Sequence, residues 1–257
     1  MSSPVRIALL GASGRMGQAV LDVAAATEGV KVTAALVGPA SASLNKSSHG
    51  LTYGSDIAAA LAGADVLLDF SLPESTGQAL EACLKAGKPL VTGVTGMDEG
   101  LKARVAEAAK RIPVLAAPNM SLGVALLSRM AEQAARVLGP DFDIEISEAH
   151  HRHKKDAPSG TALRLAEVMS KARGSAPVDR DPGRQGPRQP GSIGFSVVRA
   201  GDIVGEHTVL FAGAGERLEL SHRAQSRSTF AHGALSAARW IAGRKPGLYN
   251  LADTFAA

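Results

Sequence analysis

The stretch from Val5 to Gly17 constrains the fold more than any other part of the chain. Val5 to Leu10 is a short apolar run that ends in the turn GASGRMG, and helical spacing of apolar residues follows. A buried strand that passes through a glycine turn into a helix is typical of the opening unit of a dinucleotide-binding fold. Its spacing is G-x-x-G-x-x-G instead of the commoner G-x-G-x-x-G, and a glycine pattern alone is weak evidence. Its place directly after the first strand strengthens the prediction.

Strands and helices then alternate over some 120 residues, which predicts an α/β fold with a Rossmann-type, doubly wound parallel sheet. Ligands of such sheets bind at the carboxyl ends of the strands, where Phe70-Ser71, Gly93 to Gly96 and Ala117 to Asn119 are expected as nicotinamide neighbours. Each of these segments alone is more typical of a tight connection. The further strands are expected at Lys31 to Val37, Ala64 to Phe70, Lys88 to Val94 and Pro113 to Ala117, with helices near Asp56 to Leu61, after Pro73 and from Asp98 to Lys110.

The end of the second strand reads Val37-Gly38-Pro39, where a dinucleotide fold often carries an acid that binds the ribose 2′-hydroxyl. An acid would repel a 2′-phosphate, and none is present, while Lys46 follows nearby. The sequence therefore favours NADPH weakly without excluding NADH. The alternative is that this loop contacts no ligand.

A second organisation begins at Leu122, and it predicts a central α+β domain with a mixed sheet over residues 122–227. The first domain is expected over residues 1–121 and 228–257, because a final helix, Phe230 to Ile241, is expected to return to it. A mixed sheet with one exposed face often pairs subunits, so an oligomer is expected. The expected elements are a helix at Leu122 to Leu138, a strand at Phe142 to Ile146, a long mobile loop at Ala172 to Ser192, and antiparallel strands at Ile193 to Val198, His207 to Phe211 and Arg217 to Leu220.

The segment EAHHRHKKDAPSGTAL, which begins at Glu148, carries the chemistry. Three histidines, one arginine and two lysines fall within six positions, and such a cluster is either a solvated basic face or a site for phosphate or carboxylate. Ser159 is a plausible N-cap, so Gly160 and Thr161 would begin a helix whose N–H groups attract anions. A histidine here also has the acidity to protonate an electron-rich carbon near neutral pH.

Composition excludes several classes of protein. The net charge is +4, and many basic residues gather between Arg152 and Arg188 instead of forming an even coat, which favours a local anion site over nucleic acid. A single cysteine, Cys83, forbids an intrachain disulfide and fits a reducing, cytoplasmic compartment; neither a secretory signal nor a membrane span is expected. Metal binding by the histidines is disfavoured because neighbouring Arg152, Lys154 and Lys155 repel a cation, so no metal is expected.

The motifs together resemble the 4-hydroxy-tetrahydrodipicolinate reductase family, also called dihydrodipicolinate reductases. The resemblance rests on GASGRMG, DFSLPE, VTGVTG, AAPNMSLGV, the histidine-lysine segment and VRAGDIVGEHTVLFAGAGERLELSHRAQSR, which cover nearly the whole chain in order. It implies NAD(P)H-dependent reduction, with loss of water, of a cyclic dicarboxylate on the diaminopimelate route to lysine, by a homotetramer. Many members carry an acid, often followed by Arg, where this chain has Val37-Gly38, so the family's dual use of both cofactors is not assumed.

The resemblance also implies roles for individual residues. His150 is the expected proton donor and Lys154 the expected ligand of a substrate carboxylate; His151, Ser159, Gly160 and Thr161 complete the expected substrate site. The expected cofactor residues are Gly11, Ser13, Gly14, Arg15, Met16, Phe70, Gly93, Thr95, Ala117, Asn119 and Met120. Two alternatives stay open at this point: another nicotinamide-dependent dehydrogenase, and a module that senses NADPH without catalysis.

Overall fold

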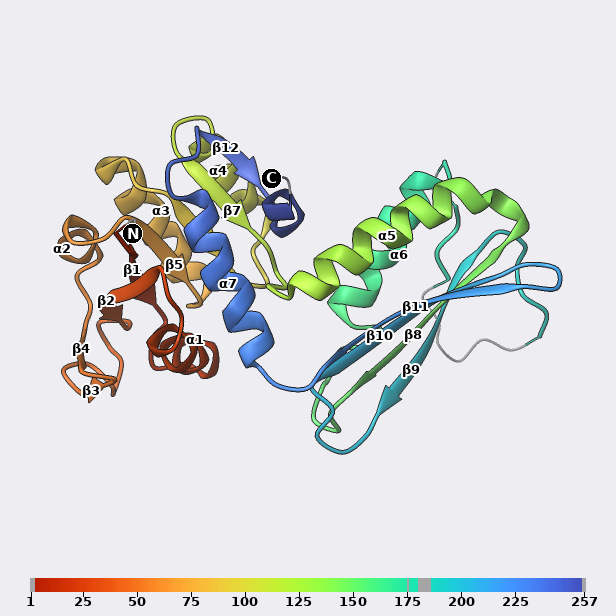
Figure 1. Cartoon of the computed structure of the whole chain (residues 1–257), viewed down its shortest axis with the longest axis horizontal. Coiled ribbons are helices and arrows are strands. Elements are labelled where there is room, and N and C mark those ends of the chain that lie inside the picture. Colours follow the sequence, from red (N-terminus) through yellow and green to blue (C-terminus); the bar gives the residue numbers. More distant parts are fainter. Residues whose placement is uncertain (1–2, 175, 180–185, 256–257) are drawn as a thin grey trace. The chain divides into compact units, whose positions relative to one another are not determined.

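The computed structural model describes residues 3–174, 176–179 and 186–255. The chain forms two compact units (Figure 1). One unit consists of the N-terminal segment that ends at Leu122 and the C-terminal segment that begins at Arg227, and the other is Gly123–Ser226. Among the described residues, no helix is both long and apolar enough to cross a membrane.

The first unit contains an eight-stranded sheet whose order is β12-β7-β6-β5-β1-β2-β4-β3. All neighbouring strands pair in parallel except β3 and β4, which form an antiparallel hairpin. The chain passes from β1 to β2 on one side and returns through β5 on the other, so β1 and β5 flank the topological switch point. The strands are Val5–Leu10 (β1), Val30–Leu36 (β2), Ser47–Ser48 (β3), Leu51–Gly54 (β4), Val66–Asp69 (β5), Leu90–Thr92 (β6), Pro113–Ala116 (β7) and Gly247–Tyr249 (β12).

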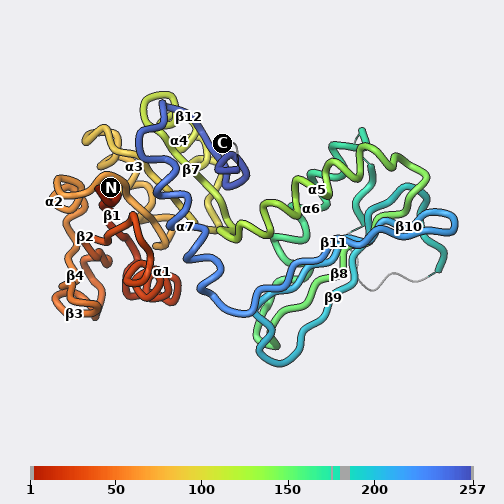
Figure 2. The backbone as a smooth tube through the Cα atoms, viewed as in Figure 1, coloured from red at the N-terminus to blue at the C-terminus, as the bar shows by residue number. Residues whose placement is uncertain are grey.

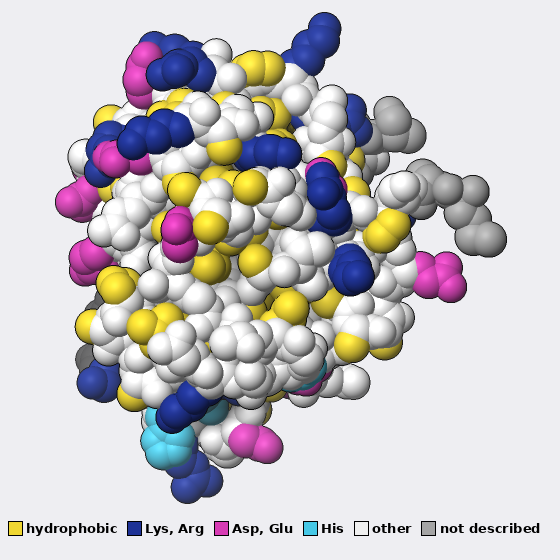
Figure 3. All heavy atoms as spheres, turned by 90° about the vertical axis from the view of Figure 1, so that its left-hand side faces the viewer, with side chains coloured by type: hydrophobic (Ala, Val, Ile, Leu, Met, Phe, Trp, Pro, Cys, Tyr) yellow, Lys and Arg dark blue, Asp and Glu magenta, His cyan; other side chains and the backbone are white. Residues whose placement is uncertain are grey.

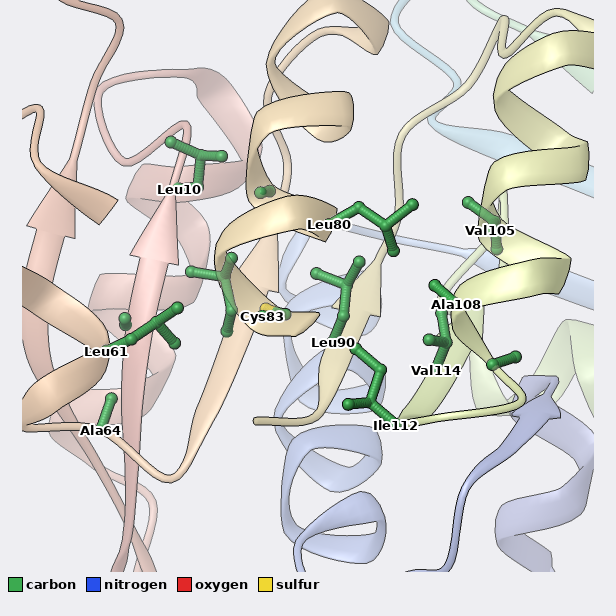
Figure 4. Packing of buried hydrophobic residues seen from close by; sticks show 14 of the residues in the cluster. Leu10, Leu61, Ala64, Leu80, Cys83, Leu90, Val105, Ala108, Ile112 and Val114 are labelled. Carbon is green, nitrogen blue, oxygen red and sulfur yellow. The ribbon is translucent and has the colours of Figure 1, made fainter. Parts of the chain in front are cut away.

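Helices cover both faces of this sheet. Helices α2, α3 and α4 share one buried apolar cluster with the central strands, in which Leu80 and Cys83 pack near Leu90 (Figure 4). Helix α7 follows the second unit in sequence, contacts β1, β5, β6 and β7, and lies against α1 (Figure 2). The helices are Arg15–Ala25 (α1), Ile57–Ala62 (α2), Pro73–Ala86 (α3), Glu99–Ala108 (α4) and Ser228–Ile241 (α7), with a 3-10 turn, Leu251–Phe255 (η2), near the C-terminus.

The second unit is a four-stranded mixed sheet with order β11-β10-β8-β9. Alternate residues of its strands, such as Ile144, Ile146, Val209 and Phe211, are buried in one cluster with apolar residues of α5 and α6. The helices thus cover one face of the sheet (Figure 1). The elements are Leu122–Leu138 (α5), Gly139–Asp141 (η1), Asp143–His150 (β8), Gly160–Ala172 (α6), Ile193–Arg199 (β9), Gly205–Ala212 (β10) and Arg217–Ala224 (β11).

The predicted fold class is confirmed, with three differences in detail. The strand at Ile193–Arg199 (β9) runs parallel to β8, although an antiparallel arrangement was expected. Strand β8 continues to His150, four residues beyond the predicted end, and its alternation of buried residues with more exposed ones persists to His150. Short strands β3, β4 and β12 lacked an apolar run long enough to predict them. Part of the loop predicted at Ala172 to Ser192, namely residues 175 and 180–185, lies outside the described residues.

Basic, acidic and apolar side chains are interspersed on the exposed face of the first unit that Figure 3 presents. On this face the Lys and Arg side chains do not gather into one continuous patch. A protein that binds nucleic acid along such a surface would present a basic stripe, so the net charge of the chain does not by itself indicate that activity.

Candidate active site

The glycine turn between β1 and α1 lies at the topological switch point of the first sheet. Gly11 has φ +82°, and a Cβ there would lie 2.5 Å from the carbonyl oxygen of Phe70, at the end of β5. A Cβ at Gly17 would lie 2.2 Å from the carbonyl oxygen of Gly11, so α1 packs directly on the turn. Ser13, Gly14 and Arg15 are exposed at the start of α1, and Met16 is half-buried. The turn therefore has the open backbone and helix start that bind a pyrophosphate.

A buried carboxylate fixes the neighbouring rim. Asp69, at the end of β5, is fully buried and accepts hydrogen bonds from the backbone N–H and hydroxyl of Ser71 and from the hydroxyl of Thr76, 2.7 Å away. Burial raises the pKa of Asp69, and these hydrogen bonds oppose that shift. The Asp69 side chain thus holds the connection from β5 to α3 in one conformation beside the glycine turn.

The other predicted cofactor residues follow the next two strands. Gly93 follows β6, and its lack of a side chain makes room for the ring of Phe70, since a Cβ would lie 2.3 Å from Cε1 of that ring. Thr95 is exposed, whereas Ala117 and Met120 are buried after β7. Asn119 accepts a hydrogen bond from the N–H of Ser121. The fold therefore gathers all the predicted cofactor residues at the carboxyl ends of β1, β5, β6 and β7. The side chain of Met120 is buried, so a cofactor at this edge would meet the backbone of Met120.

Val37 and Gly38, which follow strand β2, differ in burial. Val37 is 3% exposed and donates its backbone N–H to Gly54, so its side chain belongs to the core. Gly38 is exposed, and a Cβ at this residue would meet no atom within 4 Å. Of these two positions, only position 38 has open space for a larger side chain.

In the second unit, His150 is buried at the end of β8 and paired with Glu148, which lies on the same face of the strand. Nδ1 of His150 lies 2.6 Å from Oε2 of Glu148. Both guanidinium nitrogens Nη1 and Nη2 of Arg199 donate to this carboxylate, each at 2.8 Å. Burial alone would raise the pKa of Glu148, but hydrogen bonds from His150, Arg199 and Ser159 lower it to about 2. Glu148 is therefore ionised, and Nδ1 of His150 donates to it.

Ser159 is the N-cap of α6, as predicted. Its hydroxyl oxygen accepts from the N–H of Ala162, and its own N–H donates to Oε1 of Glu148 at 3.0 Å. The same hydroxyl lies 3.1 Å from Nε2 of His207, a residue of β10 whose ring meets that of His150 edge to face. Burial, and then the charge of His150, lower the pKa of His207 to about 4. His207 is therefore neutral at physiological pH.

Lys154 lies in the turn between β8 and α6. Its ammonium nitrogen is 2.9 Å from Oδ1 of Asp156, and its side chain is 22% exposed. The N–H of Lys154 donates to the carbonyl of His151, whose own Nδ1 has no hydrogen-bond partner among the described residues. Gly160 is exposed and Thr161 half-buried at the first turn of α6. One short segment thus combines a histidine, an ammonium group and a helix start.

Sequence reasoning missed three residues of this group: Glu148, Arg199 and His207. Glu148 had a signal, because the second residue before His150 shares its face of a strand once β8 is extended to His150. Arg199 and His207 had no local signal, because each lies on another strand and reaches the site only through the sheet register. In the first unit, Asp69 and Thr76 were also missed, although they are only seven residues apart in sequence.

Comparison with known proteins assigns both units to one family. Residues 5–120 match the family model described as dihydrodipicolinate reductase, N-terminus, and residues 123–255 match the C-terminus model of the same name. The chain is similar to the 4-hydroxy-tetrahydrodipicolinate reductase of Thiobacillus denitrificans, with 52% identity and 97% of each chain covered. The protein of the same name from Alkalilimnicola ehrlichii is 50% identical over 96% of this chain and 97% of its own.

A solved structure agrees with these relatives. Dipicolinate-bound dihydrodipicolinate reductase from Paenisporosarcina sp. TG-14 is 25% identical, with a TM-score of 0.81, and the match covers 97% of this chain and 99% of the other. The family models together span almost all of the described residues, and the alignments with the relatives cover nearly the full length of both proteins. The chain therefore belongs to the dihydrodipicolinate reductase family.

Proposed function

We propose that the protein catalyses the NAD(P)H-dependent reduction of 4-hydroxy-tetrahydrodipicolinate to tetrahydrodipicolinate, with loss of water, in the diaminopimelate route to lysine. Relatives of nearly identical length that are about half identical in sequence carry this activity in their names. The observation that carries the proposal within this chain is the buried His150, paired with Glu148, in the same segment as Lys154 and the start of α6.

The substrate carries two carboxylates, and the second unit offers the cations and donors to hold them. Lys154 would bind one carboxylate by a charge-assisted hydrogen bond, together with Ser159 and the first-turn N–H groups of Gly160 and Thr161. His151 would complete the site. The dipicolinate in the name of the Paenisporosarcina structure is itself a planar cyclic dicarboxylate, which supports this class of ligand.

The reaction consumes one hydride and one proton and releases one water. A reduced nicotinamide held by the first unit would supply the hydride. His150 would supply the proton to the ring carbon that becomes electron-rich, and Glu148 would stabilise the charged imidazole before transfer. The protein groups that bind the two carboxylates would hold the substrate ring in one orientation during proton transfer, so that binding energy contributes to the rate.

The residues of the first unit fit a dinucleotide. Gly11, Ser13, Gly14, Arg15 and Met16 would receive the pyrophosphate at the start of α1, and Phe70, Gly93, Thr95, Ala117, Asn119 and Met120 would line the nicotinamide side. Because Gly38 offers no carboxylate at the ribose position, a 2′-phosphate meets no repulsion there. We therefore favour NADPH over NADH.

We further propose a homotetramer in the cytoplasm. The sheet of the second unit is covered by helices on one face, and Val198 of β9 and Leu218 of β11 are large apolar residues exposed on its strands. A second copy of the chain would cover such a surface. The single cysteine is buried, which agrees with a reducing compartment.

The test is NADPH and NADH oxidation by the purified protein, with substrate generated from pyruvate and aspartate semialdehyde by the synthase of the preceding step. We expect rapid oxidation that requires the synthase, with NADPH preferred, and tetrahydrodipicolinate as the product by mass spectrometry. Tight NADPH binding without oxidation would favour a sensing module instead. Oxidation with an unrelated amino acid or semialdehyde alone would favour another dehydrogenase.

A further inference from the structure

We infer that Glu148 is a positioning residue for catalysis: clamped by Arg199, its carboxylate holds Nδ1 of His150, so that Nε2 is the ring atom that delivers the proton. This inference rests on the proposed function, in which His150 is the proton donor. Glu148 itself touches neither substrate nor cofactor in this account. It acts through His150 and through the start of α6.

Each carboxylate oxygen of Glu148 accepts two hydrogen bonds. Oε2 accepts from Nδ1 of His150 at 2.6 Å and from Nη1 of Arg199 at 2.8 Å. Oε1 accepts from Nη2 of Arg199 at 2.8 Å and from the N–H of Ser159 at 3.0 Å. The side chain of Glu148 is completely buried, so its charge is stabilised by these four donors and not by solvent. A carboxylate held by four donors has one orientation.

That orientation decides which nitrogen of His150 is available. An ionised carboxylate only accepts hydrogen bonds, so Nδ1 carries a proton in both charge states of the ring. Nε2 has no hydrogen-bond partner among the described residues, and a Cβ at Gly205 would lie 3.1 Å from it. Because Gly205 at the start of β10 has no side chain, the space next to Nε2 of His150 stays open. A carboxylate on one ring nitrogen both fixes the tautomer and stabilises the imidazolium.

The same ion pair links the proton donor to the expected carboxylate site. Nη2 of Arg199 also donates to the carbonyl of Asp156 at 2.6 Å, within the turn that carries Lys154. Ser159, bound to Oε1 of Glu148, is the N-cap of α6. The buried carboxylate of Glu148, with Arg199, thus fixes the end of β8, the turn and the start of α6 relative to one another. A ligand bound at α6 would therefore meet His150 in a fixed geometry.

Other charged and titratable groups lie around His150. Arg199 approaches from β9 through the shared carboxylate, and His207 approaches from β10 with ring centroids 5.2 Å apart. The charges that act on neutral His207 include His150, Glu148, His222 and Lys154. Of these groups, only Glu148 is hydrogen-bonded to the ring of His150, so its replacement changes the immediate partner and leaves the rest in place.

Glu148→Gln tests the inference, because the amide keeps the size of the side chain and removes the charge. Glu145→Gln is the matched control: Glu145 lies on the same strand and pairs with Arg188 at 2.7 Å, away from His150. We expect Glu148→Gln to lower kcat roughly 10²- to 10⁴-fold and to shift the alkaline limb of the kcat profile to lower pH by about one unit. The dipicolinate Kd should change less than about tenfold. Glu145→Gln should leave the limb in place.

A second measurement does not depend on activity. In long-range ¹H–¹⁵N spectra of protein labelled in its histidine rings, His150 should carry its neutral-state proton on Nδ1 in the wild type and lose this preference in Glu148→Gln. If the wild type oxidises no NAD(P)H, the proposed function fails while the spectra still test the positioning. An Nε2–H tautomer in the wild type would overturn the inference. So would a Glu148→Gln enzyme that loses kcat, dipicolinate affinity and thermal stability in parallel, with the limb of its profile unchanged.

Discussion

The ammonium group of Lys154 lies 2.9 Å from Oδ1 of Asp156. Partial burial opposes ionisation of Asp156, but the hydrogen bond from Lys154 and the nearby charge of Arg199 outweigh it and lower the pKa of Asp156. Without substrate, the cation proposed to bind a carboxylate is thus already paired with one. A substrate carboxylate must share Lys154 with Asp156 or displace it.

Replacement of Asp156 by Asn should therefore strengthen dicarboxylate binding. An exposed ion pair contributes up to about 1 kcal/mol, so we expect the dipicolinate Kd to fall about two- to fivefold. Isothermal titration calorimetry with dipicolinate measures this directly, with Lys154→Ala as the opposite control, since it should raise the Kd. Weaker binding by Asp156→Asn would mean that Asp156 positions Lys154 instead of competing for it.

An acid at position 38 should shift the cofactor preference. Gly38 is exposed with open space around its Cβ position, so Gly38→Glu can be accommodated, whereas a carboxylate at buried Val37 would disturb the core. Because the new charge repels a 2′-phosphate, we expect the ratio of kcat/KM for NADPH over NADH to fall about tenfold. Gly38→Gln has the same size without the charge and should retain the wild-type ratio. Equal ratios in the two variants would contradict the proposed ribose position.

Acid should destabilise the fold in two pH windows. His207 has a pKa lowered from 6.5 to about 4 by burial and by His150, so the unfolded chain binds a proton that the folded chain excludes. Its contribution to stability is present above pH 6.5 and is lost as the pH falls to about 4, by about 3 kcal/mol in all. The depressed pKa of Glu148 adds a second loss between about 4.5 and 2.

The upper window can be tested by thermal unfolding at pH 7 and pH 5. We expect His207→Gln to reduce the difference in melting temperature between these two conditions, whatever its effect at pH 7. His153→Gln alters an exposed ring and should keep the wild-type difference. If His207→Gln shows the full wild-type difference, the acid sensitivity has another source.

Two glycines of the first turn should respond differently to alanine. A Cβ at Gly17 would lie 2.2 Å from a backbone oxygen, so Gly17→Ala should lower the melting temperature by several degrees. A Cβ at Gly14 would lie 3.2 Å from the Gly11 oxygen, which a small shift relieves. Gly14→Ala should therefore stay folded yet bind NADPH about tenfold more weakly or worse, by fluorescence titration, because its Cβ would occupy the path of the pyrophosphate. Unchanged NADPH affinity would argue against this turn as the pyrophosphate site.

The sequence predicted the parallel sheet well because its signals are local. Val5–Leu10 and Val66–Asp69 are apolar runs bounded by turns, and the helices between them show their own period. Strands β3 and β12 escaped prediction because two or three residues show no period. The direction of β9 was wrong because pairing direction depends on the partner strand, which local pattern does not identify.

The candidate site likewise contains residues that local sequence predicted and residues that it did not. His150, Lys154 and Ser159 fall in one segment, so their types and spacing indicated an anion site with a proton donor. Arg199 is 51 residues from Glu148 in sequence, and His207 is 48 residues from Ser159. Their contacts arise from the register of β8 with β9 and β10, and no pattern in the sequence alone reports that register.

The most direct test of the central claim is steady-state NADPH oxidation by three proteins: the wild type, Lys154→Ala and Lys155→Ala, with the enzymatically generated substrate. Loss of a charge-assisted hydrogen bond should lower kcat/KM of Lys154→Ala roughly 10- to 100-fold, with the Kd for NADPH unchanged. Lys155 is an exposed neighbour of the same charge, and its removal should leave kcat/KM within about twofold of the wild type. Equal activity of all three proteins, or loss of NADPH binding in Lys154→Ala, would contradict the assignment of the dicarboxylate to the second unit.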